Sequence, residues 1–101
     1  MIVNIYYWRE TDCSTIVELP DRIGENIEEY IKIFHKYIVS NQTCEHFYTY
    51  AFEYVDDRMP PSEKISDFLY YLRLYHLEDH EKYTIIKENA PLDPQYKSAE
   101  L

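Results

Sequence analysis

The feature that most constrains this fold is an apolar stripe of helical period in the first half of the chain. Between residues 27 and 38, large apolar side chains recur three or four residues apart, and charged residues occupy positions between them. This spacing places the apolar side chains on one face of an α-helix. We therefore predict a helix over residues 24–39. The stripe consists of Ile27, Tyr30, Ile31, Phe34, Tyr37 and Ile38.

The segments before this helix have the character of β-strands. Residues 2–8 and 15–19 are rich in β-branched and aromatic side chains, and the polar residues 10–14 separate them. Pro20 ends the second segment, because a proline nitrogen has no hydrogen to donate to a neighbouring strand. The sequence therefore predicts a β-hairpin ahead of the helix.

The second half of the chain predicts three more elements and a tail. Residues 44–55 are apolar at both alternating sets of positions, which favours a central strand, with a helix as the alternative. Residues 60–62 then supply two prolines and a serine N-cap. Residues 65–75 repeat the helical stripe, and residues 83–87 have the composition of a short strand. We expect the tail, residues 89–101, to be poorly ordered.

The predicted order of elements is β-β-α-β-α-β. This order indicates an α+β domain over residues 1–88, in which a small, antiparallel-rich sheet carries two helices on one face. A chain of 101 residues, of which 46% are hydrophobic, suffices for one core and is too short for two domains.

The charge balance restricts the classes of partner. The chain has 19 acidic and 10 basic residues and a net charge of −9, which opposes binding to nucleic acid and to anionic membranes. No apolar run approaches the ~20 residues of a membrane span, and no basic segment precedes an apolar one at the N-terminus. We expect a cytoplasmic protein. Gly24 is the only glycine, which excludes glycine-rich phosphate loops.

Two pairs of residues resemble fragments of catalytic sites. His76 and His80 have the spacing at which two turns of a helix share one metal ion, as in zincins and inverzincins, but no glutamate stands directly after the first histidine or directly before the second. Cys44 and His46 would face the same side of a strand. We predict no catalytic residues, no metal and no cofactor, and a small metal-dependent hydrolase using His76 and His80 is an alternative.

The remaining unusual features are tyrosine and clustered acidic residues. The chain contains 12 tyrosines, more than a core of this size buries, and exposed tyrosine is enriched in protein interfaces. The acidic residues cluster at the start of the first helix, after the predicted central strand and near residue 79. We therefore predict a protein-binding surface. Its predicted residues are Glu25, Glu28, Glu29, Asp56, Asp57, Tyr70, Tyr71, Glu78 and Asp79.

In size and composition, the whole chain resembles the small acidic inhibitors made by phages and mobile elements, such as anti-CRISPR and anti-restriction proteins, and also toxin-immunity proteins. This resemblance carries no motif. It implies an inhibitor that acts in the host cytoplasm as a nucleic-acid mimic and occupies the basic nucleic-acid-binding site of a nuclease or defence effector. An immunity protein against a toxin is the alternative that this resemblance leaves open.

The second predicted helix also suggests self-association. Eight of the ten residues from 68 to 77 are large and apolar, so packing one side on a sheet leaves apolar rings on the other side. An exposed apolar patch of this kind usually marks an interface. We expect a homodimer through this helix, centred on Tyr71, with the target protein as the alternative partner of the same face.

Overall fold

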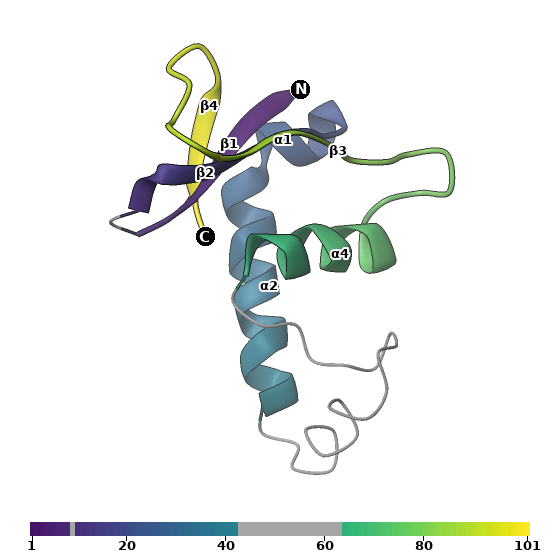
Figure 1. The fold of residues 1–101 in the computed structure, drawn as a ribbon. Helices are drawn as coiled ribbons and strands as arrows, with labels where there is room; N and C mark the ends of the chain where they lie inside the picture. The colour runs from purple at the N-terminus through teal and green to yellow at the C-terminus, as the bar shows by residue number, and fades with distance from the viewer. Residues whose placement is uncertain (9, 43–63) are drawn as a thin grey trace.

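The structure of the protein is a computed structural model that describes residues 1–8, 10–42 and 64–101 (Figure 1). The predicted central strand over residues 44–55 lies outside the described residues. The described helices are α1 (Asp21–Glu25), α2 (Ile27–Gln42) and α4 (Ile65–Tyr75). The described strands are β1 (Ile2–Tyr7), β2 (Glu10–Glu18), β3 (Thr84–Ala90) and β4 (Lys97–Glu100).

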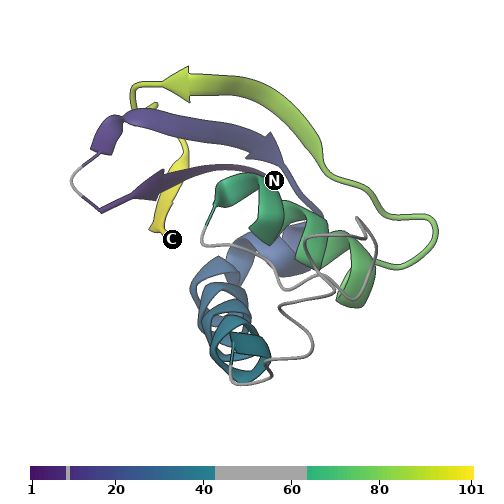
Figure 2. The ribbon, with the colours of Figure 1, turned by 60° about the horizontal axis from the view of Figure 1, so that its bottom comes forward.

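The domain is an α+β fold with helices on one side of a four-stranded sheet (Figure 2). The strand order is β3-β2-β1-β4. β2 runs antiparallel to both β1 and β3, whereas β1 and β4 are parallel. The expected antiparallel-rich sheet is therefore a mixed sheet. The expected order of elements is also wrong, because the described chain has three helices between its first and last pairs of strands.

The core lies between the sheet and the helices. Val3 and Ile5 of β1 and Val17 of β2 are fully buried on the side of the sheet that the helices cover. The predicted stripe of α2 meets them, and its residues Ile27 and Phe34 are also fully buried. Burial of this apolar surface is the main force that holds the layers together.

The predicted first helix is interrupted at Asn26. The backbone of Asn26 leaves the helical region, at φ −116° and ψ 27°, and separates α1 from α2. Its side-chain Nδ2 donates to the carbonyl oxygen of Arg22 at 2.9 Å. Asparagine competes for backbone partners in this way and favours helix ends. The apolar period continues across the break, so the periodicity by itself gave no sign of it.

β2 begins earlier than the sequence predicts. The polar residues 10–14, expected to be the hairpin loop, belong to this strand, and Tyr7 already pairs with Glu10. The register of the β1–β2 pairing shifts between Ile5 and Tyr7. An irregularity at this point accommodates the additional residues of β2. The hairpin turn is consequently short, and Trp8 stands at its tip.

The chain end completes the sheet where the sequence predicted a tail. β4 pairs with β1, and its residue Ala99 is buried. Asn4 of β1, fully buried on the sheet face away from the helices, donates to the carbonyl oxygen of Asp93 at 2.9 Å and accepts from the N–H of Asp93 at 3.0 Å. A buried amide requires such partners, so Asn4 fastens the β3–β4 connection to the sheet.

Among the described residues, no helix combines the length and the apolarity that crossing a membrane requires.

Replacing Asn4 by alanine tests this fastening. The change leaves the N–H of Asp93 without its side-chain acceptor, so we expect Asn4→Ala to lower the free energy of unfolding by about 2 kcal/mol. Urea denaturation measures the loss. Ser98→Ala is the control, because the hydroxyl of Ser98 is 3.4 Å from the Asn4 amide and the side chain is exposed. An Asn4→Ala protein as stable as this control would contradict the assignment.

Candidate functional site

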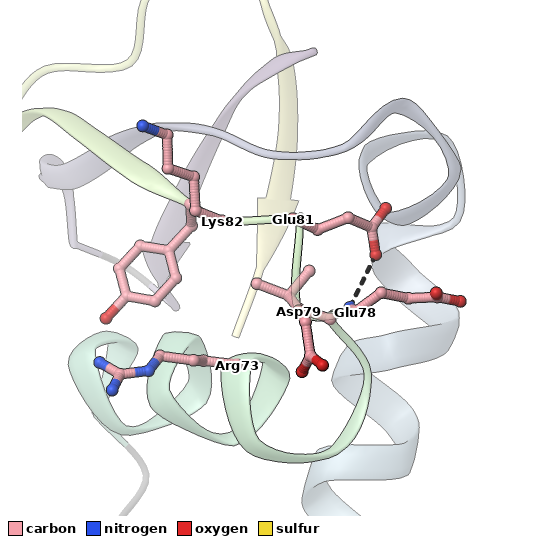
Figure 3. A pocket seen from close by; sticks show the side chains of 7 residues that line it. Arg73, Glu78, Asp79, Glu81 and Lys82 are labelled. Carbon is pink, nitrogen blue, oxygen red and sulfur yellow. Dashed lines mark hydrogen bonds between the residues drawn. The ribbon is translucent and has the colours of Figure 1, made fainter.

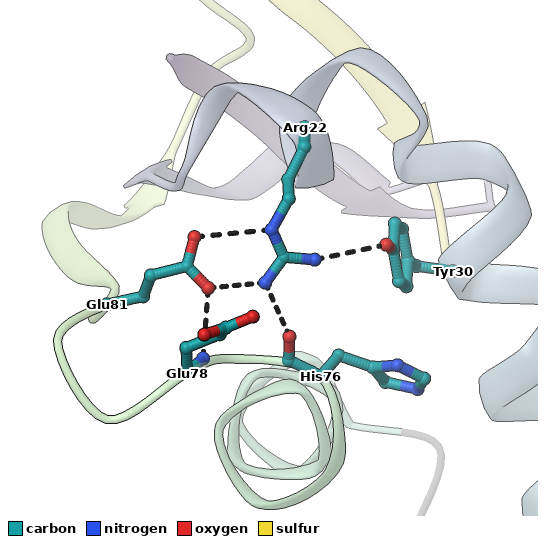
Figure 4. A network of polar contacts seen from close by, with 5 residues as sticks. All are labelled: Arg22, Tyr30, His76, Glu78 and Glu81. Carbon is teal, nitrogen blue, oxygen red and sulfur yellow. Dashed lines mark hydrogen bonds and ion pairs between the residues drawn. The ribbon is translucent and has the colours of Figure 1, made fainter.

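Arg22 of α1 holds the α4–β3 loop, which comprises residues 76–83, against the helices (Figure 4). Its guanidinium donates to both carboxylate oxygens of Glu81 and, at 2.7 Å, to the carbonyl oxygen of His76. Glu81 also accepts the backbone N–H of Glu78 at 2.9 Å. We call this set of contacts the Arg22 clamp. It connects the end of α4 and the middle of the loop to the first helix.

The Arg22 clamp shifts the titration of both partners. The hydrogen bond from Arg22, followed by the one from the Glu78 backbone, holds the pKa of Glu81 below its ordinary value. The same hydrogen bond raises the pKa of Arg22. The clamp is therefore intact at neutral pH and weakens in acid, as the pH falls through the lowered pKa of Glu81.

His76 lies beside the clamp, between two tyrosine rings. Its Nε2 is 3.0 Å from the hydroxyl of Tyr71, and the rings of Tyr30 and Tyr71 meet the imidazole edge to face, each with its centroid at 5.1 Å. Burial, and then the positive charge of Arg22, lower the pKa of His76. Burial also raises the pKa of Tyr71. The imidazole is thus held in its neutral form near pH 7.

An aromatic layer joins α2 to α4. Phe34 contacts Phe68 and Tyr71, with ring centroids 5.2 and 5.3 Å away. Tyr37 stacks at 4.9 Å from Tyr71, and its hydroxyl is 3.1 Å from that of Tyr75. Several of the surplus tyrosines therefore pack between two helices, where the sequence suggested exposure.

The α4–β3 loop borders an open depression of about 460 Å³ (Figure 3). Its lining includes two basic and three acidic side chains, and the carboxylate of Glu81 is already engaged by Arg22. Its charge therefore favours neither an anion nor a cation. The lining residues are Arg73, Leu77, Glu78, Asp79, Glu81, Lys82 and Tyr83.

The predicted acidic cluster at the start of α2 is largely neutralised. Glu28 pairs with Lys97 of β4 at 3.1 Å, and Glu29 pairs with Lys32 at 3.4 Å. Glu25 is exposed and makes no ion pair with any described residue. Two of the three predicted residues of this cluster therefore have a lysine partner, and Glu25 has none among the described residues.

The other predicted partner-binding residues divide into three groups. Glu78 and Asp79 are exposed on the α4–β3 loop. Asp56 and Asp57 lie outside the described residues. The two tyrosines point in different directions: Tyr70 is 39% exposed, whereas Tyr71 is only 6% exposed and belongs to the core. The prediction that Tyr71 is available to a partner is wrong, since α4 directs it into the aromatic layer.

One surface that the sequence did not predict combines a large aromatic ring with exposed acidic residues. It comprises Trp8, Glu10, Asp12 and Glu100, and we call it the hairpin-end surface. Trp8 is 65% exposed. The three carboxylates are exposed, and among the described residues none of them has an ion-pair partner.

Strand register brings Glu10 and Glu100 of the hairpin-end surface to the same end of the sheet. Glu10 pairs with Tyr7 on one side of β1, and Glu100 pairs with Tyr6 on the other side. The α-carbons of the two acidic residues therefore lie about 10 Å apart, two strand spacings, but their side chains leave opposite faces of the sheet, because Tyr6 and Tyr7 are successive residues of β1. Figure 2 shows the C-terminus beside the end of the β1–β2 hairpin. Residues 10 and 100 are 90 positions apart in the chain, so no sequence window could reveal their proximity.

The histidine pair does not form a helical metal site. α4 ends at Tyr75, so His76 is its C-cap and His80 lies in the loop beyond it. In the described ranges, no group of three or more His, Cys, Asp and Glu residues is arranged to hold a metal ion. Cys13 is an exposed residue of β2, while Cys44 and His46 lie outside the described residues.

Comparison with known proteins identifies no relative. No family model matches the chain, no curated protein sequence matches it, and no solved structure matches its fold.

Two neighbouring tyrosine variants test the orientation of α4. We expect Tyr71→Glu to lower the free energy of unfolding by about 3 kcal/mol or more, because it places a carboxylate in the core. Tyr70→Glu should change it by less than about 1 kcal/mol. Equal losses in urea denaturation would show that α4 is oriented differently.

The expected homodimer needs a different variant from the one that the sequence suggested. Because Tyr71 is buried, only exposed rings such as Tyr70 are available to a second copy through α4. We expect sedimentation at micromolar concentration to show a dimer that Tyr70→Glu dissociates. A monomer would refute this dimer.

Proposed function

We propose that the protein is an inhibitor that binds the basic nucleic-acid-binding site of a nuclease or defence effector through its hairpin-end surface. The observation that carries this proposal is the combination of exposed Trp8 with three exposed carboxylates that no described residue neutralises. The proposal requires neither a catalytic residue nor a cofactor. It keeps the function class predicted from the sequence and changes the residues that would perform it.

The chemistry of the hairpin-end surface supports a basic partner. Glu10, Asp12 and Glu100 would pair with lysine or arginine side chains that otherwise hold phosphates. Trp8 can stack on a guanidinium or ammonium group, and tryptophan is the best of the aromatic side chains at this. Tryptophan and arginine are also enriched among the residues that dominate interface energies.

Long-range charge would accelerate such an encounter. The whole chain carries a net charge of −9, and a basic nucleic-acid-binding groove focuses the opposite potential. The attraction raises the association rate, while contacts of the aromatic ring slow dissociation. Because two of the three acidic residues belong to β2 and the third to β4, the sheet limits the ordering that binding has to impose.

An immunity protein against a basic toxin would use the same surface in the same way. The two alternatives differ in the partner and in the genes nearby, since an adjacent toxin gene indicates an immunity protein. The metal-dependent hydrolase is less well supported, because Nε2 of His76 is within hydrogen-bonding distance of Tyr71.

Charge reversal at the hairpin-end surface tests the proposal. The first step is to identify the partner by affinity capture from the native host and mass spectrometry. We expect the triple variant Glu10→Lys, Asp12→Lys and Glu100→Lys to weaken binding to that partner about tenfold or more and to flatten its salt dependence. Isothermal titration calorimetry at two salt concentrations measures both effects, and added DNA or RNA should compete with the unmodified protein.

The matched control reverses Glu25, Glu28 and Glu29. Two of these residues already have lysine partners, so we expect a smaller loss of affinity from this second triple variant. A larger loss than in the hairpin-end variant would assign binding to the start of α2, as the sequence predicts. Binding indifferent to both variants and to salt would refute the nucleic-acid-mimic mechanism.

A further inference from the structure

His76 is a titratable residue that the proposed function leaves unused, and it occupies the junction of three elements. Its backbone carbonyl accepts a hydrogen bond from Arg22 of α1, while its ring lies against Tyr30 of α2 and Tyr71 of α4. A change in the charge of this ring therefore acts directly on the contacts that hold the α4–β3 loop.

The groups that face His76 favour a neutral imidazole. Arg22 is the positively charged neighbour, and Glu81, the only carboxylate that pairs with Arg22 in the described chain, directs its oxygens to that guanidinium. Tyr30 and Tyr71 contribute aromatic rings that meet the imidazole edge to face, and the hydroxyl of Tyr71 is 3.0 Å from Nε2 of His76. Glu78 contributes its backbone N–H to Glu81, and its side chain is exposed. A proton on His76 would thus add a second positive charge beside Arg22 in a half-buried place.

We propose that His76 and the Arg22 clamp form a pH-sensitive latch that closes the α4–β3 loop at neutral pH and opens it when His76 takes up a proton. Opening separates residues 76–83 from α1, and so changes the positions of Glu78 and Asp79. The latch is a property of the free protein and does not depend on the function proposed above.

The closed loop and the open loop differ in how readily His76 binds a proton, and this difference sets the direction of the pH dependence. In the open loop the imidazole is solvated and regains its ordinary affinity for a proton, whereas in the closed loop burial and Arg22 lower its pKa. The open state therefore binds more protons in acid. Closing is most favourable above the ordinary histidine pKa and becomes less favourable as the pH falls through the lowered value.

Hydrogen exchange and histidine titration of the full chain test the latch. We expect backbone amides of residues 76–83 to lose protection about threefold or more between pH 7.5 and pH 5.5, after correction for the intrinsic pH dependence of exchange. The protection of backbone amides in β1 and β2 should change less over the same pH range. NMR titration should give His76 a pKa below the ordinary value of a solvated histidine.

Variants separate His76 from other sources of pH dependence. His76→Gln preserves a hydrogen-bonding partner for Tyr71 and cannot take up the proton, so loop protection should become nearly independent of pH between 5.5 and 7.5. His80→Gln is the matched control, since His80 is an exposed residue of the same loop, and it should retain the unmodified pH response.

Two results would overturn the latch. One is a His76 pKa at or above the ordinary value of a solvated histidine, which needs no variant and is informative even if His76→Gln folds poorly. The other is loop protection that does not change with pH in the unmodified protein. Both measurements use the protein without a partner, so they fail or succeed independently of the hairpin-end surface.

Discussion

The packing of α2 is the constraint on which the rest of the structure depends. The apolar face of this helix packs against both the sheet and α4. Ile27 belongs to the core shared with the sheet, and Phe34 contacts Phe68 and Tyr71 of α4. The fully buried ring of Phe34 therefore helps to position α4. Where α4 ends decides where the following loop begins, and thus where His76 meets Arg22. The latch is in this sense a consequence of how one helix is packed.

Charge in this protein is organised by contacts between elements. A lysine of β4 neutralises Glu28, and Arg22 of α1 neutralises Glu81, although neither base stands near its partner in the sequence. At the hairpin end, Glu10 and Glu100 lie opposite neighbouring residues of β1, and neither has an ion-pair partner among the described residues.

The two proposals concern different ends of the molecule. The hairpin-end surface belongs to the sheet, where backbone pairing holds the side chains, whereas the latch belongs to a loop that three side-chain contacts of Arg22 retain. Local opening is easier in the loop, since it breaks few contacts and exposes little apolar surface. This difference explains why a binding surface suits the sheet and a pH response suits the loop.

The sequence by itself determined the elements whose signal is local. The stripe around Phe34 predicted α2 because helical period is visible within a few turns, and the β-branched residues before Pro20 predicted the hairpin strands. Only the tertiary structure decided that Lys97–Glu100 forms a strand beside β1, that Tyr71 is buried, and that Glu10 and Glu100 come to the same end of the sheet. These facts depend on register and on pairing between distant residues, whose energies arise only once the chain has folded.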